Sequence, residues 1–185
     1  MITQIDLTRG TAPTTPTAVD VALEASVTNE RATSMIEASW HLAEAYTGRT
    51  YWPVTAAVAV ATLEADGTVT WPRYPYPSAV TVDEWQGGAW ASHTGHEYVP
   101  ETGEVLNLTA GRYRITQTGT VTPDEPQPHV VEAVRNLALY QLIHSAARRE
   151  FKTMTAGDST LTREQLYGLF KGSGAGVLIA SEVRW

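Results

Sequence analysis

Apolar residues recur at helical spacing in two separate stretches of the chain, which indicates two long helices that each bury one face. Thr28 or Asn29 can cap the first helix, and Gly48 ends it. Its apolar face consists of Ala32, Met35, Ile36, Ser39, Leu42, Ala43 and Tyr46. Its charged face carries Arg31, Glu37 and Glu44. Together with a short helical turn over residues 17–25, this pattern predicts a helical zone over residues 17–48.

The second helix begins at Pro128, which suits the first helical position, behind the acidic pair Asp124 and Glu125. Its apolar stripe consists of Val130, Val134, Leu137, Ala138, Gln141, Leu142 and Ala146. Its end is basic, and the helix dipole favours the positive charges of Arg148, Arg149 and Lys152 there. We therefore expect one long helix over residues 128–152.

Between the two helices, over residues 51–122, apolar and polar residues alternate in the manner of half-buried strands. The main expected strands are 54–63, 68–71, 79–85, 105–108 and 112–121. Asp66-Gly67 would turn the first of these back onto the second as a hairpin, and Gly87-Gly88 would form another turn. Short strands with turns at this spacing predict a small antiparallel sandwich or barrel.

The two ends of the chain have different characters. Residues 1–16 hold glycine, prolines and many threonines, and we expect a flexible or docked arm there. Residues 153–160 are expected to be a polar linker, and Thr162 with Gln165 forms a capping box for a short helix that follows. The C-terminal segment, residues 160–185, contains a glycine hinge at Gly172, Gly174 and Gly176. Apolar residues follow the hinge: Val177, Leu178, Ile179, Val183 and Trp185.

An apolar tail behind a hinge would expose hydrophobic surface in a monomer, so it must be buried somewhere. It can fold back onto its own core, or it can insert into a groove or sheet edge of a partner. The hinge favours the partner. The predicted fold is therefore α+β and a single domain over residues 1–185. It comprises a small bundle of two long helices plus short ones, an antiparallel sandwich-like or barrel-like insert, and an extended C-terminal arm.

Charge and composition narrow the range of functions. Thirteen Lys and Arg residues against twenty Asp and Glu give a formal net charge of -7, which argues against stable binding to duplex DNA. An acidic surface along which DNA slides without sticking remains compatible with this charge. The chain has no cysteine, so disulfides and thiolate metal sites are excluded. No signal peptide is visible, and the longest apolar run is too short to span a bilayer, so we expect no membrane association.

Few residues could carry chemistry. The best metal candidate is the stretch His93-Thr94-Gly95-His96-Glu97, but its spacing differs from the helical zinc motif, and a polar turn at a hairpin tip explains it better. The adjacent carboxylates of Asp83 and Glu84 would point to opposite faces of a strand. No nucleophile elbow or phosphate-binding loop is present. We therefore expect no catalytic, cofactor or metal site, and no enzyme.

Aromatic residues crowd the β region, and they allow two interpretations. They are Trp52, Trp71, Tyr74, Tyr76, Trp85, Trp90 and Tyr98. Exposed coplanar rings on a small β scaffold would bind carbohydrate by stacking. Rings that fill the core or a subunit interface are the more common arrangement, and we favour it.

The order of these motifs resembles the head-to-tail connector, or adaptor, proteins of long-tailed phages and gene transfer agents. The similarity runs from residue 28 to residue 185. The segments that carry it are Ala45-Tyr46-Thr47-Gly48-Arg49 with Tyr51-Trp52-Pro53-Val54, Asp66-Gly67-Thr68-Val69-Thr70-Trp71-Pro72, Arg112-Tyr113-Arg114-Ile115-Thr116 with Gly119, the proline-led helix 128–151, and residues 173–179.

The resemblance implies a structural virion protein, assembled in the host cytoplasm, that forms a ring in the head–tail neck. Such a ring is commonly a dodecamer beneath the portal protein of the DNA-filled head. The C-terminal segment would grip the portal through Val177, Leu178, Ile179, Val183 and Trp185, with Gly172, Gly174 and Gly176 as the hinge. The other face would receive a stopper or tail-terminator protein, and DNA would pass through the lumen without specific binding. The alternatives are a stopper or tail-terminator ring protein, both expected to be more wholly β, and a carbohydrate-binding module.

Overall fold

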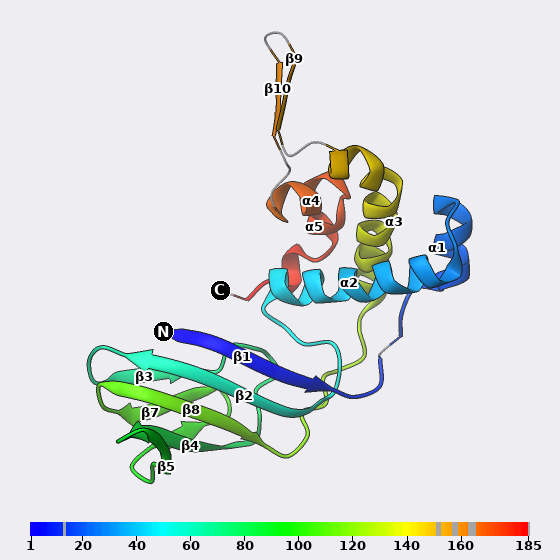
Figure 1. The fold of residues 1–185 in the computed structure, drawn as a ribbon. Coiled ribbons are helices and arrows are strands. Elements are labelled where there is room, and N and C mark those ends of the chain that lie inside the picture. The colour runs from blue at the N-terminus through cyan, green and yellow to red at the C-terminus, as the bar shows by residue number, and fades with distance from the viewer. Residues whose placement is uncertain (13, 151–152, 157–158, 163–165, 185) are drawn as a thin grey trace. The chain divides into compact units, whose positions relative to one another are not determined.

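The computed structural model describes residues 1–12, 14–150, 153–156, 159–162 and 166–184, which divide into two compact units. The first, called the β unit here, combines Met1–Pro13 with Gly48–Asp124. The second, the helical unit, combines Thr14–Thr47 with Glu125–Trp185. Each unit is built from two separate segments of the chain, and the α+β fold class predicted from the sequence is confirmed (Figure 1).

The β unit is a sandwich of two antiparallel sheets. The five-stranded sheet has the order β1-β2-β8-β4-β5: β1 is Ile2–Arg9, β2 Val54–Leu63, β8 Gly111–Thr118, β4 Ala79–Gln86 and β5 Ala89–Ser92. The three-stranded sheet has the order β3-β7-β6: β3 is Gly67–Thr70, β7 Glu104–Leu108 and β6 Glu97–Val99. Both sheets end in edge strands, so the described strands form an open sandwich and not a closed barrel.

Side chains from both sheets meet in one core. Its buried members are Val54, Ala57, Ala59, Ala61, Val69, Trp71, Val80, Val82, Val105, Leu108, Tyr113, Ile115 and Val121. Alternation along β2 turns Ala57, Ala59 and Ala61 toward this core. Ala61 pairs across the strands with Tyr113, and both are fully buried, so the small side chain leaves room for the large ring.

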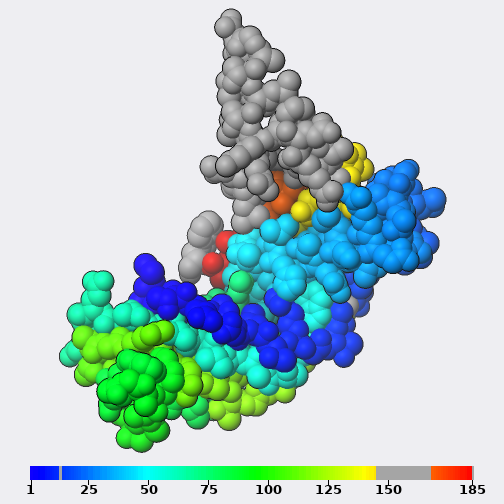
Figure 2. All heavy atoms as spheres, viewed as in Figure 1, coloured from blue at the N-terminus to red at the C-terminus, as the bar shows by residue number. Residues whose placement is uncertain are grey.

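The N-terminal residues form strand β1, which settles the choice between a flexible and a docked arm in favour of docking. β1 pairs with β2 along its length, from Ile2 opposite Ala61 to Arg9 opposite Val54. Ile2 and Leu7 pack against the core of the sandwich. Figure 2 shows β1, in dark blue, at the surface of the β unit.

The predicted hairpin at Asp66-Gly67 is wrong. Strand β3 pairs with β7 in the other sheet, because both edges of β2 are already hydrogen-bonded, one to β1 and one to β8. The turn therefore crosses from one sheet to the other, and the Asp66 carboxylate accepts a hydrogen bond from the Ala110 amide at 3.0 Å. The second predicted turn is correct, since Gly87 and Gly88, with φ of 58° and 93°, connect β4 to β5.

The helical unit confirms both long helices. Helix α1 is Ala18–Ala25, α2 Asn29–Thr47 and α3 Pro128–Glu150. The buried faces of α2 and α3 include Ala32, Ile36, Trp40 and Ala43, and Val130, Ala133, Val134, Leu137 and Ala138. Thr28 caps α2, since its hydroxyl accepts a hydrogen bond from the Arg31 amide at 3.4 Å. None of the described helices is long and apolar enough to cross a membrane.

The chain beyond α3 contains more regular structure than expected. Strands β9 (Thr153–Ala156) and β10 (Ser159–Thr162) pair as a hairpin where a polar linker was predicted. Three short helices follow: α4 (Leu166–Gly172), α5 (Ala175–Leu178) and the 3-10 helix η1 (Ala180–Glu182). Thr162 of the predicted capping box lies in β10, and Gln165 lies outside the described residues.

Two glycines with similar backbone but different surroundings give a test of the sandwich. Gly103 (φ +70°) lies against Tyr76, and a Cβ there would come within 2.5 Å of the ring. Gly119 (φ +77°) has nothing within 4 Å of the corresponding position. Gly119→Ala should lower the free energy of unfolding by about 1–2 kcal/mol, the cost of a left-handed backbone. Gly103→Ala should cost about 1–3 kcal/mol more, because it also overpacks the site.

Urea unfolding of the two variants, followed by tryptophan fluorescence, measures this difference. Gly119→Ala is the control for backbone strain alone. Equal destabilisation by the two substitutions would show that Tyr76 does not pack on Gly103.

Candidate functional site

The C-terminal segment is compact where it is described. The extended arm predicted from the sequence is therefore wrong for residues 166–184, which form α4, α5 and η1. Ala175 and Ile179 are 0% exposed and Phe170 is 1% exposed, so the segment contributes to the core of the helical unit. The Phe170 ring stacks on Tyr46 of α2 with 4.1 Å between the ring centroids. Of the two possibilities considered for the tail, folding back onto its own unit describes these residues.

Two polar contacts fix the far end of this segment. Glu182 lies 3.2 Å from His129 at the start of α3. The Arg184 amide donates a hydrogen bond to the carbonyl of Thr47, at the end of α2, at 2.9 Å. These contacts and the burial of Ile179 hold η1 against both long helices.

The predicted hinge glycines occupy a tight helix–turn–helix connection. Gly172 ends α4, and Gly174 adopts a φ of +73° before α5, a conformation that favours glycine. Gly176 lies close to Phe170, where a Cβ would come within 3.4 Å of its Cβ and carbonyl oxygen. The Ser173 hydroxyl, which accepts a hydrogen bond from the Ala175 amide at 3.3 Å, reinforces the turn. The backbone conformation at Gly174 and the close packing at Gly176 therefore account for glycine at these two positions. Motion about a hinge here stays a prediction.

The five residues predicted to grip the portal have different surroundings. Val177 is 85% exposed, one of the most exposed large apolar side chains among the described residues. Leu178 and Val183 are partly buried, whereas Ile179 is fully buried. Trp185 lies outside the described residues. The structure therefore places one fully outward-facing apolar residue, Val177, beside two that are half accessible.

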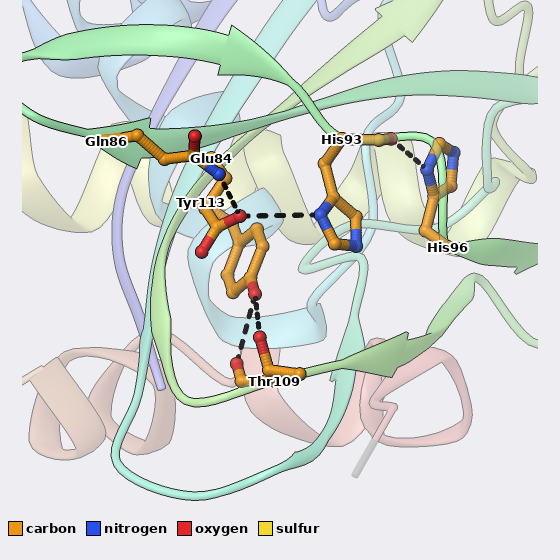
Figure 3. A network of polar contacts seen from close by, with 6 residues as sticks. All are labelled: Glu84, Gln86, His93, His96, Thr109 and Tyr113. Carbon is orange, nitrogen blue, oxygen red and sulfur yellow. Dashed lines mark hydrogen bonds and ion pairs between the residues drawn. The ribbon is translucent and has the colours of Figure 1, made fainter.

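The histidine pair forms a polar turn next to β4 (Figure 3). His93 Nδ1 lies 3.5 Å from a carboxylate oxygen of Glu84, and the His93 ring meets Tyr113 edge to face at 5.4 Å. His96 Nδ1 donates a hydrogen bond to the His93 carbonyl oxygen at 2.7 Å, which uses one of its two nitrogens within the turn. Among the described residues, no group of three potential metal ligands comes together.

The aromatic residues divide between the core and the surface of the β unit. Trp52 and Trp71 are buried, at 8% and 4% exposure, whereas Trp85 is 42% exposed. Trp85 pairs across the strands with Trp90, and their rings meet edge to face at an interplanar angle of 70°. Such rings do not present one flat platform, which counts against the carbohydrate interpretation.

Two arginines of β8 complete this exposed aromatic group, although no pattern in the sequence predicted their contact with the tryptophans. Arg112 lies over both rings, 5.9 Å from Trp85 and 5.7 Å from Trp90, and Arg114 lies 5.1 Å from Trp90. Arg114 also donates hydrogen bonds to the Asp83 carboxylate at 2.7 and 3.1 Å. Asp83 and Glu84 thus point to different partners, as expected from their adjacent places on a strand.

The alternation of β8 could have revealed the arginines. Tyr113 and Ile115 are buried, so Arg112 and Arg114 must share the outer face of the strand. We call the group formed by Trp85, Trp90, Arg112 and Arg114 the Trp–Arg cluster.

The architecture that we compare with known proteins is an α+β chain with a discontinuous β-sandwich unit and a discontinuous helical unit. No protein-family model matches the sequence, and no curated protein matches it. The chain is similar to a solved structure described as the neck of an empty GTA particle computed with C6 symmetry. The similarity covers 99% of this chain and 96% of the other, with 13% sequence identity and a TM-score of 0.56.

Two further solved chains are similar at lower scores. One is from the virion of a native gene transfer agent (GTA) particle, with 14% identity, a TM-score of 0.49 and coverage of 92% of this chain and 94% of the other. The second is from the neck of a native GTA particle computed with C12 symmetry, with 18% identity, a TM-score of 0.42 and coverage of 91% and 94%. The first of the three, with a TM-score of 0.56, shows a shared fold. The chain has the fold of a gene transfer agent neck protein, which confirms the predicted resemblance at the level of structure.

Burial raises the pKa of Tyr98 to about 12, from an ordinary value of 10.0, and nearby Tyr76 and Glu101 add to the shift. Its hydroxyl donates a hydrogen bond to the Pro77 carbonyl at 2.7 Å. The pKa of the Tyr98 phenol is higher in the folded chain than in the unfolded one, so the neutral phenol stabilises the fold. This contribution to the free energy of unfolding is fully present below pH 10 and is lost as the pH rises through about 12.

Tyr98→Phe should therefore be less stable than the wild-type chain at about pH 8, and the gap should narrow as the pH rises from about 10 to about 12. Urea unfolding of both proteins over this range gives the difference at each pH. A gap that stays constant with pH would contradict the assignment.

Proposed function

We propose that this chain is a structural head-to-tail adaptor, which assembles as a ring between the portal of a DNA-filled head and the tail. The fold similarity carries the proposal: it extends over 99% of this chain and 96% of a chain from a GTA neck, at a TM-score of 0.56. The order of sequence motifs points to the same class of protein. The lengths of α2 and α3, 19 and 23 residues, count against the more wholly β stopper and tail-terminator proteins.

The portal would be gripped by the exposed part of the C-terminal segment. Val177 is 85% exposed, and burial of an apolar side chain of this size against a partner contributes roughly 1.5–3 kcal/mol. Leu178 and Val183 would add to the contact from their half-buried positions. Ile179 has a different role in the free chain, because it anchors the segment in the core of the helical unit. The same contact repeated around a ring would make weak individual grips strong together.

The remaining partners follow from the position of the ring. Neighbouring copies of the chain would surround a lumen through which DNA passes without specific binding, and the formal net charge of -7 suits such passage. A stopper or tail-terminator protein would bind the face away from the portal. The protein would act without a catalytic residue, metal or cofactor, in the neck of the virion, after assembly in the cytoplasm of the host.

Val177→Asp tests the portal contact without disturbing the core, because the side chain is 85% exposed. The matched control is Leu23→Asp on α1, which is 81% exposed and belongs to the same unit. Val177→Asp should weaken binding to the portal ring by about tenfold or more, since a charge replaces a buried apolar contact, and Leu23→Asp should leave it unchanged.

Native mass spectrometry of each full-length chain mixed with the portal ring from the same genome measures the number of bound copies. If Val177→Asp bound the portal as strongly as the wild-type chain, the proposed contact through Val177 would be contradicted. A wild-type chain that does not bind the portal at all would contradict the adaptor role.

A further inference from the structure

The outer faces of the two sheets of the β unit carry different charged side chains. On the five-stranded sheet, the outer face bears the Trp–Arg cluster, in which Arg114 is paired with Asp83 and Arg112 lies over the two indole rings. On the three-stranded sheet, Glu97 lies beside Leu106, and Glu104 lies beside Val99, in the register of β6 and β7. These four face outward, since their neighbours Tyr98 and Val105 pair with each other toward the core. The second outer face is thus acidic with apolar positions between the charges.

The Trp–Arg cluster has the composition of a protein interface. Tryptophan and arginine are among the residue types most enriched at the energetic centres of interfaces, and tryptophan is highly buried on average. Trp85 is 42% exposed, and Arg112 is exposed on the same face. Among the described residues, Arg112 contacts the two indole rings and has no carboxylate partner, so its charge is free to pair with a second molecule.

Arg112 is suited to an acidic protein surface, because opposite charges across an interface favour association. The chain itself is acidic, with a formal net charge of -7, so another copy of it can supply such a surface. A copy of the same chain offers such a surface at Glu97 and Glu104. The contact would join two different faces of the same chain, and repeated contacts of this kind generate rings when the rotation per copy closes.

We infer that the Trp–Arg cluster of one copy docks on the acidic face of β6 and β7 of the next copy. Trp85 and Trp90 pack against Val99 and Leu106, while Arg112 pairs with Glu97 or Glu104. This inference rests on the proposed ring and assigns its contact within the β unit. It is separate from the portal grip, which belongs to the helical unit.

Charge reversal gives a test that distinguishes a lost contact from a misfolded chain. Arg112→Glu places a negative charge against the acidic face of the next copy. The double variant Glu97→Lys with Glu104→Lys places positive charges against Arg112. Each variant alone should self-associate about tenfold or more weakly than wild type. A mixture of the two should recover, because every contact in an alternating assembly then joins opposite charges.

Sedimentation velocity of the full-length chains measures self-association in solution, and native mass spectrometry measures it on the portal ring. Recovery in the mixture, and loss of wild-type association as salt is raised, are the expected results. Wild-type association by either single variant, or a mixture no better than its components, overturns the inference. So does tight binding of a single-stranded oligonucleotide that Arg112→Glu removes while self-association stays intact.

The outcomes also separate this inference from the proposed function. Self-association of the wild type that responds to charge reversal, without any binding to the portal, would support the interface and contradict the adaptor role. Portal binding by wild-type copies that never associate with one another would support binding to the portal and contradict the proposed interface.

Discussion

The β unit depends on strand β2, whose two edges are hydrogen-bonded to segments from different parts of the chain, β1 and β8. Since neither edge is free, the chain after β2 cannot turn back as a hairpin and must cross to the second sheet. The same pairing ties residues 1–13 into a unit whose other strands begin after residue 48. Between the two segments of the β unit the chain forms α1 and α2, and the discontinuity of both units follows from this one arrangement.

Much of the fold could be predicted from the sequence because alternation and helical spacing are strong signals in this chain. Strand β2 and helix α2 begin and end where the pattern changes. The signal for β1 is weaker, since the register is irregular between Ile2 and Gln4 and again at Thr8 and Arg9, which breaks the alternation. On α2 the pattern placed Glu44 on the solvent side and omitted Trp40, yet both are 1% exposed. Burial on a helix depends on which neighbours cover it, and spacing alone does not contain that information.

The C-terminal segment is a second place where the sequence pattern alone did not determine which residues are buried. Glycines followed by apolar residues allow either a mobile tail or a tight turn between short helices. The packing of Gly176 on Phe170 and the burial of Ile179 decide for the turn in this structure. The predicted grip is thereby reduced to the accessible residues Val177, Leu178 and Val183 among those described. The Trp–Arg cluster, in contrast, needed the structure, because its four residues come from three strands that are separated along the sequence.

The central claim is that this chain is a structural component of a head–tail neck. Electron cryomicroscopy of particles produced by the host that encodes it tests this claim most directly. We predict density for the chain as a rotationally symmetric ring between portal and tail, with its α5 helices toward the portal and neighbouring β units in contact. Particles that lack the chain, or that carry it only at the distal end of the tail, would contradict the account.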